Sequence, residues 1–116
     1  MINRDFNWTQ EDRKGVRVFT LKGNFNVGVA SKIRVSIEPL LSTGQSKVLF
    51  DLGGLKQLDS AGVTTLIVVF KRVRSNKGDM KIARLNGQPR EIFRLLRLDQ
   101  VFDIYEELDV ALQSFA

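Results

Sequence analysis

The stretch from Val48 to Leu52 restricts the possible folds of this chain more than any other. Four of its five residues are apolar, a pattern typical of a strand that is covered on both faces. Gly53-Gly54 is expected to loosen the backbone into a loop, in which Leu55 and Leu58 contact the core. A helix with an apolar stripe is then predicted over residues 60–75. A covered strand followed by a helix indicates an α/β sheet with parallel strands.

The rest of the chain alternates in the same way. Alternating apolar residues over 6–9 and again over 16–21 predict an antiparallel hairpin, with a turn over residues 11–15 and the second strand ending at Gly23-Asn24. A first helix is expected over about residues 29–41, because one apolar stripe runs through Ala30, Ile33, Ile37 and Leu40.

Four further elements follow the helix over residues 60–75. Met80 to Leu85 predicts a strand, and Pro89 is expected at the first position of a short helix that reaches Leu96. Residues 101–105 predict a last strand, and residues 108–115 a terminal helix. The expected order is β-β-α-β-α-β-α-β-α, an α/β fold with a mostly parallel or mixed sheet and an N-terminal antiparallel hairpin. The 116 residues are enough for one domain, 1–116.

Residue types that are missing from the chain exclude several classes of function. There is no cysteine and no histidine, so a disulfide framework, a Cys/His zinc site and a Ser-His-Asp triad are all impossible. We therefore expect no catalytic residue, no metal and no cofactor, and a protein that is not an enzyme. The first residues lack an apolar signal region, and no apolar run is long enough to span a membrane. These observations predict a cytoplasmic protein.

The net charge of +5 raises the question of a nucleic-acid partner. Basic residues gather in the second half of the chain, but acidic residues interrupt them, and no aromatic residues are interleaved for base stacking. Solvated surfaces on helices explain the pattern better. We expect no direct binding of nucleic acid, while an acidic protein partner stays open.

Ser60 is the candidate functional residue, because it lies where the helix over residues 60–75 begins. The first turn of a helix presents unpaired backbone N–H groups and the positive end of the helix dipole, a favourable place for a phosphate. Ser60 is therefore a candidate for regulatory phosphorylation. The alternative is that Ser60 only caps the helix, for which serine is a preferred residue.

A longer pattern around Ser60 resembles a known family. The strand Val48-Leu49-Phe50-Asp51-Leu52, the motif Leu58-Asp59-Ser60-Ala61-Gly62, Lys77-Gly78, and Leu98-Asp99-Gln100-Val101-Phe102 together are similar to the STAS domain of bacterial anti-sigma factor antagonists. The similarity covers nearly the whole chain.

This resemblance implies a switch between two states. An anti-sigma factor that is itself a serine kinase would bind the unphosphorylated protein and release its sigma factor. Phosphorylation of Ser60 would block binding, and a serine phosphatase would restore it. The implied partner surface consists of residues on and after the motif: Asp59, Ser60, Ala61, Gly62, Thr64 and Val68. For Asp59 the alternative is a capping role, and for Gly62 it is helix–sheet packing.

Two departures from the family pattern and two other functions bear on this hypothesis. Asn24 and Asn26 stand where many members carry acidic residues, and Arg97 replaces a usual glycine. A non-switching subunit of a lipid-transport complex or of a stress-signalling assembly is one alternative. A nucleotide-binding module is the other, although no G-x-x-x-x-G-K-[ST] or G-x-G-x-x-G motif is present.

Overall fold

The computed structural model of the chain describes residues 5–115. Residues 1–4, where a signal region would begin, and residue 116 lie outside this range. The elements follow the predicted order and have these bounds: β1 Phe6–Arg13, β2 Val16–Phe25, α1 Val27–Ser42, β3 Lys47–Leu58, α2 Ser60–Ser75, β4 Asp79–Ala83, α3 Gly87–Leu95, β5 Asp103–Tyr105 and α4 Leu108–Gln113.

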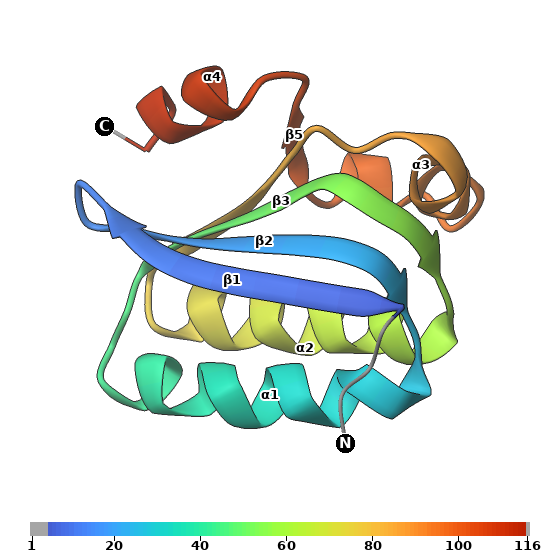
Figure 1. Ribbon diagram of the computed structural model, residues 1–116. Coiled ribbons are helices and arrows are strands. Elements are labelled where there is room, and N and C mark those ends of the chain that lie inside the picture. Colours follow the sequence, from blue (N-terminus) through green and yellow to red (C-terminus); the bar gives the residue numbers. More distant parts are fainter. Residues whose placement is uncertain (1–4, 116) are drawn as a thin grey trace.

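The five strands form one sheet in the order β1-β2-β3-β4-β5, which confirms the predicted fold. β1 and β2 pair antiparallel, and every other pair is parallel. Crossovers between parallel strands are right-handed, so a sheet that grows in one direction collects its crossover helices on one face. Figure 1 shows α1 and α2 side by side on that face, and α4 on the other.

The larger core fills the space between the sheet and α1 and α2. Its centre includes Phe19 and Phe50, both fully buried, whose ring centroids lie 5.1 Å apart at an interplanar angle of 78°. Phe93 of α3 belongs to the same core. A smaller core, which includes Val16, Val18, Leu49, Ala83 and Ala111, lies under α4 on the opposite face.

The first hairpin is tighter than predicted. The predicted turn over residues 11–15 is wrong, because β1 continues to Arg13 and only Lys14 and Gly15 form the turn. Both have positive φ angles, 56° and 85°, which is the backbone that two-residue hairpins require because it matches the strand twist. β2 also continues past Gly23-Asn24 to Phe25, with irregular pairing to β3 at that point.

The loop predicted at Gly53-Gly54 is wrong, because β3 runs through both glycines to Leu58. Pairing with the second half of β2 holds this stretch extended. The glycines are needed for space: a Cβ atom on Gly53 would lie 2.6 Å from the Arg84 guanidinium, and one on Gly54 would lie 2.8 Å from Cγ of Lys22. The side chains of Lys22, in β2, and of Arg84, just after β4, therefore lie over this part of β3.

Several other predicted bounds differ. β4 ends at Ala83 rather than Leu85, and α4 ends at Gln113 rather than at residue 115. Leu41, rather than Leu40, is the buried residue at the end of α1, and α1 begins at Val27. Pro89 is the third residue of α3, and Leu96 is 55% exposed beyond its end. Residues 101–102 lie outside β5. The bounds predicted for α2, 60–75, are confirmed.

Arg97 and Lys77 both carry positive φ angles, 58° and 61°. The resemblance leads one to expect a glycine at position 97, and the left-handed backbone there explains the preference. At the end of α2, the N–H of Lys77 donates to the carbonyl of Arg74, and the N–H of Gly78 donates to that of Val73. This is a Schellman motif whose left-handed residue is Lys77. A glycine is the residue most often found at that position, but here Gly78 is the residue after it.

Candidate functional site

The candidate site lies at the carboxyl end of β3, where α1 and α2 begin next to each other (Figure 1). Functional loops of open parallel sheets lie at this end of the strands. Ser60 is exposed and is the first residue of α2. Its hydroxyl has no hydrogen-bond partner within residues 5–115. Ser60 is therefore not the capping residue, and its side chain is available to a second molecule.

Asp59 is the N-cap of α2. Its backbone is extended, with φ −99° and ψ −175°, and Oδ1 accepts a hydrogen bond from the backbone N–H of Gly62 at 3.0 Å. The second oxygen, Oδ2, accepts from the backbone N–H of Val27, the first residue of α1, at 3.2 Å. One carboxylate thus stabilises the positive ends of two neighbouring helices. The sequence suggests a capping role as one alternative for Asp59. It does not predict the hydrogen bond that joins Asp59 to α1.

The beginning of α1 has a cap of its own. Asn26 is the N-cap, and its Oδ1 accepts from the N–H of Gly28 at 2.9 Å. An asparagine oxygen performs this task as well as an aspartate. The neutral residue at this family position therefore keeps the local structure, although it removes a negative charge from the site. Asn24, the other departure, is half-buried in β2.

The remaining predicted site residues divide into buried and exposed ones. Gly62 is buried, and a Cβ atom there would lie 2.6 Å from Leu58 and 3.0 Å from the carbonyl of Phe25, so close helix–sheet packing explains this glycine. Thr64 is exposed one turn after Ser60, whereas Ala61 and Val68 are half-buried. Thr65 is buried, and its hydroxyl donates to the carbonyl of Ala61 at 2.9 Å.

A shallow groove of about 300 Å³ between α1 and α2 contains Ser60 at its edge. The α2 side is formed by Ser60, Ala61, Thr64 and Thr65, and the α1 side by Val27, Ala30, Ser31 and Arg34. Arg34 and Ser31 were missed from the sequence. Val27, Ser31 and Arg34 share one helical face, but only the packing of α1 against α2 brings that face to Ser60.

Exposed apolar residues and an ion pair mark the edges of the same surface. Val27 and Val35 of α1 are 74% and 73% exposed. Farther along, Arg72 of α2 pairs with Glu38 of α1 at 2.8 Å, so its charge is engaged by the neighbouring helix. The surface around Ser60 is thus apolar and weakly polar, with Arg34 as its cation.

An ion pair between a buried carboxylate and a half-exposed guanidinium joins β3 to the residue that follows β4. Asp51 of β3 is 3% exposed and accepts from Nε of Arg84 at 2.9 Å and from a terminal guanidinium nitrogen at 3.0 Å. This hydrogen bond and the charge of Asp51 raise the pKa of Arg84 above its ordinary value, against a smaller effect of burial. The guanidinium therefore stays charged at any physiological pH, and its two hydrogen bonds to Asp51 join β3 to the residue that follows β4.

Within residues 5–115 there is no cluster of acidic side chains that could hold a metal ion. In that same range, none of the helices has both the length and the hydrophobicity to cross a membrane.

Replacing Asp59 by alanine should lower the free energy of unfolding by about 2 kcal/mol, because two helix N-termini each lose a capping interaction worth about 1 kcal/mol. Asp59→Asn keeps an acceptor for Gly62 and loses the one for Val27, so it should cost about half as much. Urea denaturation of the three proteins measures both values. A wild-type midpoint for Asp59→Ala would contradict the shared cap.

Comparison with known proteins agrees with the fold and with the family that the sequence resembles. The family model described as the STAS domain matches residues 7–111. BtrV of Bordetella bronchiseptica, provisionally named an anti-sigma factor antagonist, is 24% identical over 107 residues, which is 92% of each chain.

Solved structures of two proteins show the same fold. An anti-sigma factor antagonist from Mycobacterium paratuberculosis superposes with a TM-score of 0.86 at 22% identity, over 99% of this chain and 98% of that one. The Bacillus cell fate determinant SpoIIAA in its phosphorylated form gives a TM-score of 0.79 at 16% identity, over 95% of this chain and 100% of that one. Its unphosphorylated form gives 0.83, again at 16% identity, over 93% and 95%. The family match spans most of the sequence, and the chain belongs to the STAS domain family.

Proposed function

We propose that this protein is a phosphorylation-controlled anti-sigma factor antagonist and that residues 1–116 act as one STAS domain. Its unphosphorylated form binds an anti-sigma factor serine kinase, which then releases a sigma factor. Phosphorylation of Ser60 blocks that binding, and a serine phosphatase reverses it. One observation carries the proposal: the hydroxyl of Ser60 is exposed at the edge of a groove between two helices and has no hydrogen-bond partner among the described residues. The proposal also implies a cytoplasmic location.

The surroundings of Ser60 suit a switch that leaves the fold unchanged. A phosphate adds about −1.5 to −2 charges at pH 7. On the first residue of α2 it would meet the favourable end of the helix dipole, with Arg34 in the same groove. The phosphorylated domain therefore stays folded. At a docked surface the same group adds bulk and a charge that must lose its water, which opposes binding. SpoIIAA has been solved with and without phosphate, and both forms resemble this chain.

The partner surface we propose consists of the exposed residues around the groove. Ser60 and Thr64 belong to it on α2, and Val27, Ser31 and Arg34 on α1. Asp59 and Gly62 hold this surface in place rather than contact the partner. The carboxylate of Asp59 accepts hydrogen bonds from backbone N–H groups, and Gly62 is buried. Ala61 and Val68 are half-buried and contribute its floor and its far edge.

Binding of a protein, rather than of nucleic acid, suits the basic residues of the second half of the chain. Many of its arginines are paired with acidic residues: Arg72 with Glu38, Arg74 with Asp79, Arg84 with Asp51, Arg90 with Glu106 and Arg94 with Glu91. Cations that are already paired offer less charge to a phosphate backbone.

Wild-type protein recovered from its native cells should carry a phosphate-sized mass addition under some growth conditions. The addition should be absent from Ser60→Ala under every condition, because Ser60 is the proposed acceptor. Intact-mass spectrometry of both proteins, expressed from the native locus, makes the comparison.

Ser42→Ala and Ser75→Ala are matched controls, since each removes a hydroxyl at an exposed position outside the groove. Both should keep the addition. Wild-type protein that is unmodified in all conditions, or an addition that survives in Ser60→Ala, would favour a constitutive STAS subunit instead.

A further inference from the structure

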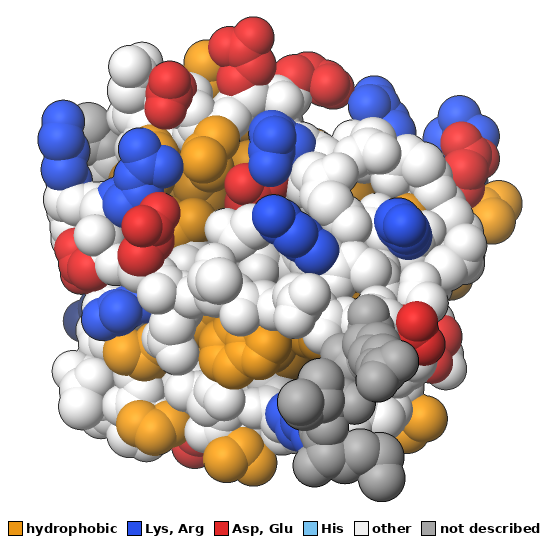
Figure 2. Space-filling view, viewed as in Figure 1, with side chains coloured by type: hydrophobic (Ala, Val, Ile, Leu, Met, Phe, Trp, Pro, Cys, Tyr) orange, Lys and Arg blue, Asp and Glu red, His pale blue; other side chains and the backbone are white. Residues whose placement is uncertain are grey.

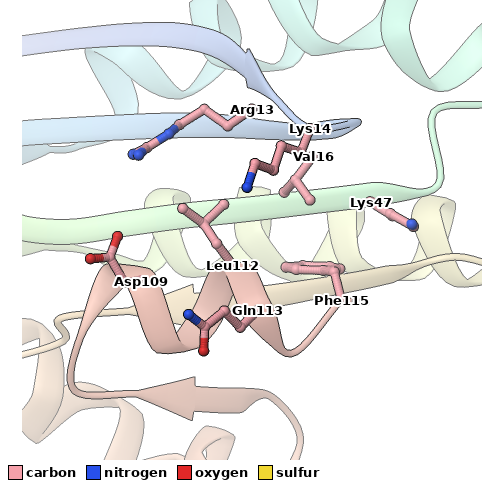
Figure 3. Close-up of a pocket in the computed structure, with 8 residues that line it drawn as sticks. All are labelled: Arg13, Lys14, Val16, Lys47, Asp109, Leu112, Gln113 and Phe115. Atoms are coloured by element: carbon pink, nitrogen blue, oxygen red, sulfur yellow. The ribbon is translucent and has the colours of Figure 1, made fainter.

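A second cavity lies at the opposite end of the sheet from Ser60, between the β1–β2 turn and α4 (Figure 3). It has a volume of about 350 Å³, within the size range of small-molecule sites. β3 passes between the two regions: Lys47, its first residue, lines this cavity, and its last residue, Leu58, nearly adjoins Ser60. The cavity is therefore separate from the groove between α1 and α2.

The inner wall of the cavity is apolar and already formed. Val16 is buried in the smaller core, while Leu112 and Phe115 are only partly buried against it. α4 is six residues long, so it covers only part of this face of the sheet. Figure 3 shows Leu112 and Phe115 extending from the C-terminal segment toward β3, and Lys14 extending from the turn toward them.

A buried lysine fixes the position of this wall. Lys81 is 7% exposed, and its Nζ donates to the carbonyl and hydroxyl oxygens of Ser114 at 3.1 and 2.9 Å. The same nitrogen lies 4.7 Å from the ring centroid of Phe115, a cation–π contact. Phe115 is thus held in place by the sheet, and no rearrangement is needed to form the cavity.

The rim of the cavity carries an excess of positive charge. Lys14 and Lys47 are exposed, and neither has an ion-pair partner within the part of the chain that the structure describes. Arg13 reaches only Glu11, at the 4.0 Å limit for such a pair. Asp109 is the one acid among the lining residues. Figure 2 shows hydrophobic atoms between α4 and the hairpin, with basic side chains beside them.

We propose that this cavity binds an amphipathic carboxylate, such as a medium-chain fatty acid. The apolar chain lies against Leu112 and Phe115, and the carboxylate pairs with Lys14 and Lys47. A small inorganic anion would leave the apolar wall unfilled, and a cationic amphiphile would meet three basic side chains against one acid. Only a ligand with an apolar body and a negative head complements both parts of the site.

Decanoate, used below its micelle-forming concentration, is the probe. Isothermal titration calorimetry should show saturable one-to-one binding to the wild-type protein. The double variant Lys14→Glu/Lys47→Glu should bind at least tenfold more weakly. Lys56→Glu/Lys71→Glu changes the net charge equally at exposed positions that do not line the cavity, and should bind within twofold of wild type. Decyltrimethylammonium, with the same chain and the opposite charge, should bind at least tenfold more weakly than decanoate.

Backbone amide chemical shifts in NMR spectra locate the bound probe independently of the variants. Decanoate should shift the amides of Val16, Leu112 and Phe115, and leave those of Ser60 and Thr64 unchanged. The proposal is overturned if wild-type protein shows no saturable binding, if both amphiphiles bind equally, or if the shifts centre elsewhere. None of these outcomes depends on phosphorylation of Ser60.

Discussion

Ser60→Asp should weaken binding of the anti-sigma factor partner at least 100-fold, while Ser60→Ala should bind it as wild type does. Ser60→Asp puts a permanent negative charge at the edge of the groove between α1 and α2. That charge must lose its water when a partner covers the groove, and no lysine or arginine other than Arg34 lines the groove to offset it. A 100-fold loss corresponds to about 2.8 kcal/mol of binding free energy. Titration calorimetry with the purified partner measures the difference.

Ser60→Asn separates charge from size in this experiment, because asparagine has the shape of aspartate without its charge. It should bind within tenfold of wild type. All three variants should melt at similar temperatures, since an aspartate in the first turn of a helix is not destabilising. If Asp and Asn weaken binding equally, steric hindrance controls the switch and the electrostatic account is wrong.

Gly78→Ala should lower the free energy of unfolding by about 3 kcal/mol, the upper part of the range for overpacked positions. A Cβ atom on Gly78 would lie 2.1 Å from the carbonyl oxygen of Ser46 and 2.6 Å from its Cα. Both atoms belong to the backbone just before β3, so they cannot turn away as a side chain would. The same carbonyl accepts the N–H of Asp79 at 2.8 Å, at the point where β3 and β4 begin to pair. Urea denaturation measures the loss.

Two other substitutions calibrate this value. Gly44→Ala meets no atom within 4 Å and should cost only the strain of its positive φ, about 1 kcal/mol. Lys77→Gly relieves the left-handed residue of the Schellman motif and should stabilise the protein by up to about 1 kcal/mol. A Gly78→Ala variant that loses no more than Gly44→Ala would show that the backbone at Ser46 yields easily.

The sequence predicts best where local and long-range requirements agree. α2 begins and ends as predicted because its N-cap, its apolar stripe and its terminal turn all lie within the helix or directly beside it in the sequence. β3 was predicted too short because Gly53-Gly54 is a poor strand sequence by itself. Its extension depends on pairing with β2 and on the Arg84 side chain that covers Gly53, and both come from distant parts of the chain.

The candidate site follows the same rule. The motif and the start of α2 place Ser60 at a helix N-terminus, and the structure confirms that position. The second hydrogen bond of Asp59 joins residues 32 positions apart, so no local pattern reveals it. No local pattern reveals the place of Arg34 either, because only the packing of α1 on α2 brings it into the groove.

The strand order also has a consequence for how the chain folds. Each strand pairs with the strand before it in the chain, from β1 to β5. Closing each pair therefore requires only a tight turn or one helical crossover, and a low average separation of contacts favours rapid folding. The sheet is able to grow strand by strand as the ribosome releases the chain. The C-terminal segment, held by Lys81, packs on a surface formed by strands that all precede it in the chain.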